Sequence, residues 1–476
     1  MVRPARFSVA MGSGKLTPGF EVQQVRARAA IGIGCVVATL SCGPWQRVGA
    51  PDKPAPGTAI TRALDAGEVY RQMGFFATGA PLPFVGAVRW LAGRTADSTL
   101  GLISLSLANH ALSFHRDGNE FIAEYRVEVS FRRDSEPARL ITSDQSVRVR
   151  SFQETLRSDE SVIFQQFVTL RPGPYTVGVF VRDRNGPAYS RQERGDTVPR
   201  LAGMALAEPV PIYEGIGRSS RDSLPRLVVN PRATLPYGGD TLRFYVEAYG
   251  LAPGTPLIAR ALNDHGVTVW AESVATRGGP ELGTAIVRIP PGRLPVGLER
   301  LDVVAPDTTL RAAAPFLVSF SGQWVVTNWN EMVSLLRYYD RQDLVAKLRS
   351  APDSERPKAW QAFWSATDPV PITPENEALD DYFRRIQIAN QRFQESTDPG
   401  WLTDRGEVFI TIGEPDETYD MANDYSRTGV HALRWIYTNL RLDLLFVDQT
   451  GFGRYRMTPG SRADFERVAS RVLRAQ

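Results

Sequence analysis

The chain has 476 residues, a length that predicts about three domains of ordinary size. Hydrophobic residues make up 43% and charged residues 22%, which is close to the average of globular proteins and excludes a largely disordered chain. The formal net charge is +3, but the 55 basic residues are spread along the chain and matched by 52 acidic ones, so the composition argues against a nucleic-acid partner.

The first feature in chain order is an apolar run over residues 29–42, which contains both cysteines, Cys35 and Cys42. Two arginines precede it, and a basic segment followed by a short apolar one predicts a secretory signal that is too short to span a bilayer. Residues 38–42 resemble a bacterial lipobox, with Thr39 where leucine is usual. We expect Cys42 to be lipidated and to become the new N-terminus, with simple secretion or an uncleaved anchor as alternatives.

Residues 1–42 are therefore interpreted as an N-terminal extension and lipoprotein signal peptide. Residues 43–60 are rich in proline and glycine, which predicts an extended tether. If Cys42 is acylated, the mature chain has no free thiol, which excludes thiolate chemistry and a cysteine-based zinc site. The four histidines are scattered, so we expect no metal site and no cofactor.

Residues 61–218 are predicted to form a β-sandwich domain with a short N-terminal helix. Tyr70, Met73 and Phe76 follow helical spacing, and residues 121–132 then alternate apolar and polar side chains as a half-buried antiparallel strand does. Turn residues separate the further strands that we expect, which are residues 140–150, 161–170 and 175–182.

Residues 222–322 are predicted to form a second β-sandwich. Residues 263–266 read Asn-Asp-His-Gly, which predicts a hairpin turn with a returning strand over residues 267–273. Residues 172–178 and 291–297 share a Pro-Gly turn followed by Val-Gly, and this pattern is typical of tandem immunoglobulin-like sandwiches.

Residues 323–476 are predicted to form an α+β domain with an antiparallel sheet. Met332, Leu335, Leu336 and Tyr339 mark one face of a helix. A second helix is expected after Thr373 as its cap, and a last one with a capping box at Ser461 and Asp464. The expected strands are residues 408–412, 433–437, 442–448 and 454–458.

Residues 398–417, with Gly400-Trp401-Leu402-Thr403-Asp404 near their start, resemble the signature of the GWxTD domain. The resemblance extends over about residues 380–455 and includes Asn390 and Trp435. That family consists of bacterial cell-envelope proteins, so the resemblance implies an envelope location and an architecture without implying a particular reaction.

The polar residues of the signature have a structural interpretation, a functional one, and a third in which they bind a peptide or glycan. In the structural one, Trp401 covers the core, Thr403 or Asp404 bonds backbone amides in a turn, and Arg405 pairs with a carboxylate. In the functional one, four candidate catalytic residues converge in a cleft that could serve hydrolysis or anion recognition. These four are Asp404, Arg405, Glu414 and Asp416, and the candidate binding residues are Trp401, Thr403, Asp404, Arg405, Asp416 and Trp435.

We therefore expect a membrane-tethered envelope lipoprotein that acts as a binding or scaffold module for a protein, peptide or glycan partner. Gly43 after Cys42 favours the outer membrane, with the body facing the periplasm or the surface. The alternative is an envelope hydrolase or transferase with a cleft around Asp404, Arg405 and Asp416. The sequence favours binding and leaves catalysis open. The acidic loop at residues 414–424 lacks the spacing of a calcium-binding hand, so a solvated loop is expected there.

Overall fold

The computed structural model describes most of the chain from Ala66 onward. The described residues are 66–133, 136–157, 162–306, 309–322, 324–371, 375–395, 398–420 and 430–475. The predicted signal peptide with Cys42 and the predicted tether lie outside these ranges, so they stay predictions.

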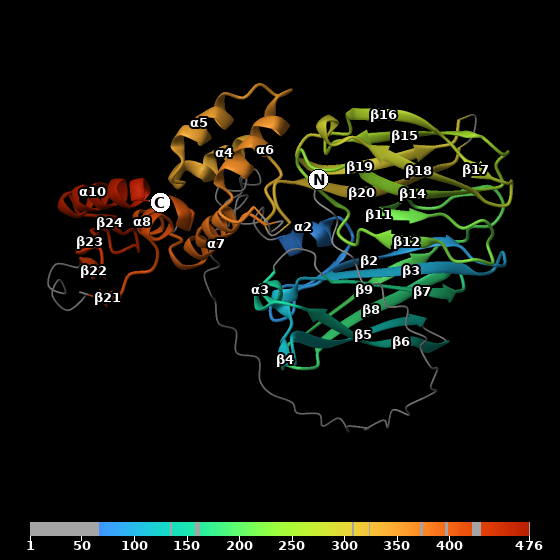
Figure 1. Cartoon of the computed structure of the whole chain (residues 1–476), viewed down its shortest axis with the longest axis horizontal. Helices are drawn as coiled ribbons and strands as arrows, with labels where there is room; N and C mark the ends of the chain where they lie inside the picture. The colour runs from blue at the N-terminus through green and yellow to red at the C-terminus, as the bar shows by residue number, and fades with distance from the viewer. Residues whose placement is uncertain are drawn as a thin grey trace, which may run out of the picture.

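Four β-sheets lie on top of one another in the first two thirds of the molecule (Figure 1). The first sheet follows the short helix α2 (Ala66–Gln72) and has the antiparallel strand order β1-β2-β3-β7. Its strands are β1 (Phe76–Ala77), β2 (Val85–Ala92), β3 (Thr99–Leu107) and β7 (Val162–Leu170). The second sheet has the order β4-β5-β8-β9, with β6 also paired to β5. Its strands are β4 (His115–Asp117), β5 (Glu120–Arg133), β6 (Glu136–Val149), β8 (Gly173–Asp183) and β9 (Tyr189–Val198).

The third and fourth sheets come from the following part of the chain. The third has the order β12-β11-β14-β18-β17, with β10 paired to β14, and the fourth has the order β13-β20-β19-β15-β16. The third sheet contains β10 (Ala205–Leu206), β11 (Val210–Ile216), β12 (Arg226–Val229), β14 (Leu242–Tyr249), β17 (Arg277–Gly278) and β18 (Gly283–Ile289). The fourth contains β13 (Thr234–Pro236), β15 (Pro256–Leu262), β16 (Thr268–Ala275), β19 (Gly297–Val304) and β20 (Arg311–Ser319). The strand pairs are antiparallel except β13 with β20.

The alternating pattern of β5 is confirmed, because its apolar residues face a core shared by the first and second sheets. A second core joins the first sheet to the third, and a third core joins the third sheet to the fourth. The first sheet is therefore covered on both faces, and every residue of β2 and β3 is buried. This explains why these strands are rich in apolar and small residues on both faces.

A buried polar network ties the first sheet to the third. Arg218 and Glu247 form an ion pair whose side chains are wholly inaccessible, with Nε–Oε1 and Nη2–Oε2 distances of 2.9 and 2.8 Å. The hydroxyls of Tyr245 and Tyr249 donate to the same carboxylate. Arg218 also donates to the carbonyl of Ala92, whose amide in turn donates to the Tyr249 hydroxyl. Because its members satisfy one another's charges and donors, the network specifies how the two pairs of sheets meet.

The C-terminal part combines helices with a small antiparallel sheet, as predicted. Its helices are α4 (Trp329–Leu335), α5 (Gln342–Ser350), α6 (Arg356–Thr367), α7 (Glu377–Arg392), α8 (Asp404–Ile412) and α10 (Pro459–Ala475). Its strands are β21 (Glu417–Asp420), β22 (His431–Tyr437), β23 (Leu442–Asp448) and β24 (Arg456–Met457). Phe320 at the end of the fourth sheet packs on Trp360 of α6 with ring centroids 4.6 Å apart, so one core continues from the sheets into the helices. None of the described helices has the length and apolarity needed to cross a membrane.

Several local predictions were wrong. Residues 408–412, predicted as a strand, form the second half of α8. The prediction failed because a short apolar run fits a buried helix as well as a strand. Phe76 begins β1 after the helix ends at Gln72. Asn376 caps α7, whereas Thr373 lies outside the described residues.

The predicted capping box at Ser461 and Asp464 was also wrong, since α10 already begins at Pro459. The hydroxyl of Thr458 accepts a hydrogen bond from the Ser461 amide and so supports the first turn. The expected strand over residues 454–458 is reduced to β24. The immunoglobulin-like character of the paired sheets stays a prediction.

Candidate functional site

Thr403 is the N-cap of α8. Its hydroxyl accepts a hydrogen bond from the Gly406 amide at 3.1 Å and donates one to the Gly400 carbonyl at 2.8 Å. The residue is almost completely buried. The hydroxyl therefore starts the helix and closes the preceding turn, as an N-cap threonine does.

Gly400 and Trp401 attach the turn η4 (Gly400–Leu402) to α7. A β-carbon on Gly400 would lie 1.9 Å from the Ala389 carbonyl oxygen, so only glycine permits this approach. The Trp401 amide donates to the side-chain oxygen of Asn390 at 3.0 Å, and the Trp401 ring is buried. A β-carbon on Gly406 would lie 1.8 Å from the backbone carbonyl oxygen of Gly400, so this position of α8 also requires glycine.

Asp404 joins the first turn of α8 to the end of the chain. One carboxylate oxygen accepts the Met457 amide at 2.7 Å, and the other lies 3.0 Å from a guanidinium nitrogen of Arg462. Arg462 also pairs with Glu407 at 2.6 Å. The Asp404 carboxylate is thus shared between β24 and α10.

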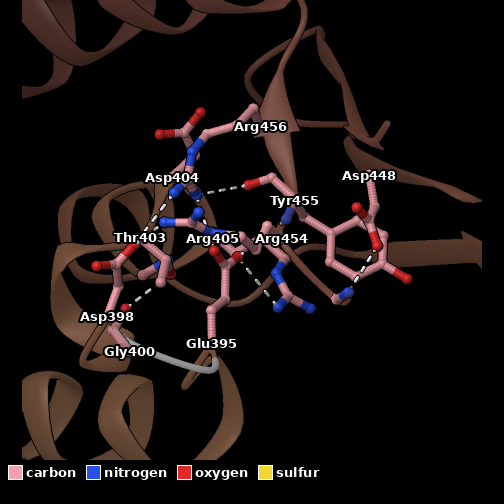
Figure 2. Close-up of polar contacts among 12 residues, drawn as sticks. Glu395, Asp398, Gly400, Thr403, Asp404, Arg405, Asp448, Arg454, Tyr455 and Arg456 are labelled. Carbon is pink, nitrogen blue, oxygen red and sulfur yellow. Dashed lines mark hydrogen bonds and ion pairs between the residues drawn. The ribbon is translucent and has the colours of Figure 1, made fainter. Parts of the chain in front are cut away.

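Arg405 reaches a buried carboxylate, Glu395, whose side chain is inaccessible to solvent. Arg405 lies 3.5 Å from one Glu395 oxygen, which also accepts the Tyr455 amide at 3.1 Å. Arg456 donates to the other oxygen at 2.8 Å (Figure 2). The guanidinium of Arg405 lies over the Tyr455 ring, 4.4 Å from its centroid. Burial lowers the pKa of Arg405, and the charge of Glu395 opposes that shift.

Asp398 completes this cluster at the surface. Its carboxylate pairs with Arg454 and Arg456 at 3.3 and 3.2 Å. Asp448 lies on the other side of the view in Figure 2, where it accepts the amides of residues 450, 451 and 453 and holds the turn after β23. Burial raises the pKa of Asp448, but the bonds from the Thr450 hydroxyl and these amides outweigh it, so the pKa is lowered. The result is a network of alternating carboxylates and guanidiniums at the junction of α8, β24 and α10.

The structure does not bring Glu414 and Asp416 to this cluster. They follow the other end of α8, about 13 Å further along the helix axis at 1.5 Å per residue. Glu414 pairs with Arg392 at 2.6 Å, and Asp416 accepts the Thr438 amide at 2.6 Å. Asp404, Arg405, Glu414 and Asp416 therefore have separate partners.

Trp435, the remaining candidate binding residue, is buried. Its ring packs against Phe393 and Phe446, with centroids 5.3 and 4.9 Å away. The functional roles predicted for the signature residues stay predictions. Their contacts within the fold explain why these residue types occupy these positions.

Glu395 was missed by sequence reasoning. It lies between α7 and the signature, with no periodic pattern around it. Only its partners make it notable: Arg405 of the signature, and Arg456 with the Tyr455 amide some 60 positions later in the chain. Among the described residues, no group of histidine, cysteine, aspartate or glutamate side chains is arranged to hold a metal ion. Part of the acidic loop, residues 421–424, lies outside the described ranges.

Residues 301–446 match the model of the GWxTD domain family. This is a GWxTD domain-containing protein. The matched region begins in β19 and ends in β23, so it includes the last two strands of the fourth sheet as well as the helices. Gly400, Trp401, Thr403 and Asp404 are the residues of the GWxTD name, and all four hold η4 and α8 in place.

No curated protein matches this chain. Solved structures that resemble parts of it include the BSP domain of a biofilm-associated protein, at 10% identity and a TM-score of 0.16, which covers 51% of this chain and 52% of that one. Trypsin-activated alpha-2-macroglobulin from Escherichia coli matches at 11% identity and a TM-score of 0.19 over 53% of this chain and 17% of that one. Dimeric latent PorU from Porphyromonas gingivalis matches at 12% and 0.21 over 49% and 20%. This chain thus spans about half of the first structure and a fifth or less of the others, and the TM-scores are too low to support an argument.

A groove runs between α7 of the GWxTD domain and the first pair of sheets. It consists of two cavities of about 660 and 860 Å³ that share His110 and Gln387. One wall is a single face of α7, because its lining residues recur at intervals of three and four. These are Glu377, Asp380, Asp381, Arg384, Gln387, Asn390 and Gln391.

The opposite wall comes mainly from α2 and the first two sheets with their connections, and Arg232 and Gly322 also contribute to it. It contains the loop between β1 and β2 and His110 of η1 (Asn109–Ala111). It also contains Gln153 of α3 (Phe152–Thr155) and Leu156, the C-cap of that helix. In Figure 1, α7 lies beside α2 and α3, which places these walls opposite each other. We call this feature the α7 groove.

Proposed function

We propose that this protein is a lipid-anchored envelope protein that acts as a binding or scaffold module. Cys42 is the proposed anchor, residues 43–60 the tether, and the paired sheets, which we take to be immunoglobulin-like, hold the GWxTD domain away from the membrane. The resemblance of residues 29–42 to a lipoprotein signal supports the location.

The observation that carries the binding role is the α7 groove. A cleft of this size at the meeting of separate structural parts is a usual place for a ligand site, and the larger of the two cavities is lined mostly by polar and charged side chains. The partner is a protein, peptide or glycan.

The alternative, a hydrolase or transferase at the signature, has less support. A catalytic carboxylate must reach the substrate with a free oxygen, but the oxygens of Asp404 are used by Met457 and Arg462. Glu395 and Arg405 are almost enclosed and contact each other. These contacts favour a structural role for the signature.

The anchoring part of the proposal is tested by mass spectrometry of the protein from membrane fractions. The expected N-terminal peptide begins at an acylated Cys42, and a Cys42→Ala variant is expected to remain unprocessed or to be released from the membrane. An unprocessed, unacylated chain in the cytosol would overturn the location.

The binding part is tested by photo-crosslinking in intact cells. The chain has only four lysines, at positions 15, 53, 347 and 358, so an amine-reactive reagent samples it poorly and a photoreactive amino acid is better. Insertion at Gln391 and Gln153 samples the groove, and insertion at the exposed Tyr189 samples the second sheet. Recovery of one envelope partner in stoichiometric yield supports the proposal. The absence of any partner at all positions, under conditions where the protein is anchored, contradicts it.

A further inference from the structure

The two ends of the α7 groove differ in charge. Four carboxyl side chains line the larger cavity, against two guanidiniums, and they are Glu375, Glu377, Asp380 and Asp381. Asp381 is neutralised locally, because it pairs with Arg384 and Arg385. The smaller cavity is lined mainly by neutral groups, including the amides of Gln387, Asn390 and Gln391.

Asp380 is a half-buried acid in this set. Its carboxylate accepts a hydrogen bond from the Trp324 indole at 2.9 Å. Burial, with the charges of Glu375 and Glu377, raises the pKa of the Asp380 carboxyl to about 6. A partly buried carboxylate near other acids gains from a cation placed beside it.

An independent observation comes from the neutral end. Asn390 is 4% exposed and lines the smaller cavity. Its oxygen is used by the Trp401 amide, but its Nδ2 has no hydrogen-bond partner among the described residues. A buried amide donor without an acceptor is uncommon, and a carbonyl is the kind of group that it lacks. Protein atoms cover this nitrogen in the free chain, so a carbonyl in the groove reaches it when the Asn390 side chain shifts toward the cavity.

The length of the groove also limits its occupant. From Glu377 to Gln391 the helix rises about 21 Å, at 1.5 Å per residue. An extended peptide advances about 3.3 Å per residue, so about six residues match this length. Such a strand also offers a carbonyl at every residue.

The aromatic residues argue against a sugar chain. Glycan sites place sugar rings on exposed aromatic faces, but the three aromatic residues that line the groove are buried, with exposures of 1–2% for Tyr70, Phe84 and Trp324. Trp324 is moreover stacked on Phe383, with centroids 3.8 Å apart.

We propose that the α7 groove binds an extended peptide segment of about six residues, with a lysine or arginine side chain at the Asp380 end and backbone carbonyls toward Asn390. This inference rests on the proposed binding function and specifies its site and the chemistry of its partner. In this arrangement the GWxTD signature supports the groove, because Trp401 orients the Asn390 amide.

The test uses the purified full chain in detergent and a fluorescein-labelled heptapeptide probe, Ala-Thr-Val-Arg-Val-Thr-Ala-amide. Two matched probes carry glutamine or glutamate in place of arginine, and a tetramer of N-acetylglucosamine represents a neutral glycan. Fluorescence anisotropy measures the affinity of the labelled peptides, and displacement of the labelled arginine probe measures that of the unlabelled glycan. The arginine probe is expected to bind at least tenfold more tightly than the glutamine probe. The glutamate probe is expected to bind most weakly.

Asp380→Asn keeps an acceptor for Trp324 and removes the charge, so it is expected to weaken the arginine probe about tenfold, equivalent to about 1.4 kcal/mol. Asp464→Asn is the matched control, since Asp464 lies on α10 in an exposed pair with Arg467 and is expected to leave affinity unchanged. Gln391→Trp should obstruct the other end and weaken binding at least tenfold with an unchanged melting temperature.

Equal affinity for the arginine and glutamine probes, no effect of Asp380→Asn, or binding of the glycan without the peptides would overturn the inference. Its failure is distinguishable from failure of the proposed function. If crosslinks form only at Tyr189 and the probes do not bind, the protein is a binding module that uses another surface. If the arginine probe binds as expected but no partner crosslinks in cells, the groove chemistry stands and the proposed scaffold role falls.

Discussion

Replacement of Gly400 by alanine tests whether the signature glycine serves close packing. The residue lies in η4 with a backbone conformation open to any amino acid, so the substitution introduces no φ strain. The added β-carbon would instead lie 1.9 Å from the Ala389 oxygen and 2.8 Å from the Asn390 α-carbon. Carbon atoms in proteins essentially never approach within 3.0 Å in this way, so η4 must move about 1 Å or more away from α7.

The cost follows from what that movement breaks. The hydrogen bond from the Trp401 amide to Asn390 is 3.0 Å long and cannot survive such a displacement in its present geometry. Its loss costs about 1–2 kcal/mol, and the overpacking with the loosened indole costs about 2–3 kcal/mol more. We therefore expect Gly400→Ala to destabilise the α7–α8 junction by about 3–5 kcal/mol.

Hydrogen exchange measured by mass spectrometry resolves this junction from the rest of the molecule. A loss of 3–5 kcal/mol corresponds to exchange at least about a hundredfold faster in peptides of α7 and α8, if these open together. Gly460→Ala is the matched control, because Gly460 lies in α10 and a β-carbon there meets nothing within 4 Å. That variant is expected to be as stable as the parent or more stable by up to about 1 kcal/mol.

Unchanged exchange in Gly400→Ala would refute the packing argument. The same would follow if Gly460→Ala and Gly400→Ala lowered stability equally, since the effect would then not depend on the Ala389 contact. A uniform acceleration over all four sheets would instead show that the junction does not unfold as a local unit.

Three other substitutions test separate contacts. Thr403→Val keeps the shape and removes the cap hydroxyl, so urea unfolding should show a loss of about 1–2 kcal/mol, whereas the same change at the half-buried Thr411 should cost less than about 0.5 kcal/mol. Glu395→Gln leaves the charge of Arg405 without its buried partner and is expected to lower stability by about 2–4 kcal/mol; a stability equal to the parent would show that this pair is replaceable. Burial raises the pKa of Glu299 from 4.5 to about 8, so the folded chain keeps a proton that the unfolded chain loses, and stability should fall as pH rises between these values. Glu299→Gln is therefore expected to match the parent at pH 4 and to be about 4 kcal/mol more stable at pH 8. A pH-independent difference would contradict this.

Local periodicity was sufficient for many elements of the fold. Residues 121–132 alternate with period two and lie in β5. The apolar residues from Leu379 to Phe393 follow helical spacing and form the buried face of α7, with Phe393 as its C-cap. These patterns depend only on which side chains of one segment face the core, so a single sequence is enough to read them. The dense order of the signature likewise identified the GWxTD domain, which the family match confirms.

The short apolar run at residues 408–412 shows where local reading fails. Its length fits either a whole strand or half of a helix. It is helical because Thr403 caps the start of α8 and because α7 and α10 pack against that helix. The sequence also does not show that β2 and β3 are buried on both faces. The second face is covered by the third sheet, which comes about a hundred residues later in the chain.

The sequence by itself determined the periodic strands and helices, the identity of the GWxTD signature, and the expectation of an exported, lipid-anchored chain. Only the tertiary structure decided what the signature residues contact, that Asp404 and Arg405 lie apart from Glu414 and Asp416, and that α7 faces the first pair of sheets across a groove. The physical reason is that these features are contacts between segments far apart in the chain. Their geometry follows from how whole sheets and helices pack, and no local pattern of residue types records it.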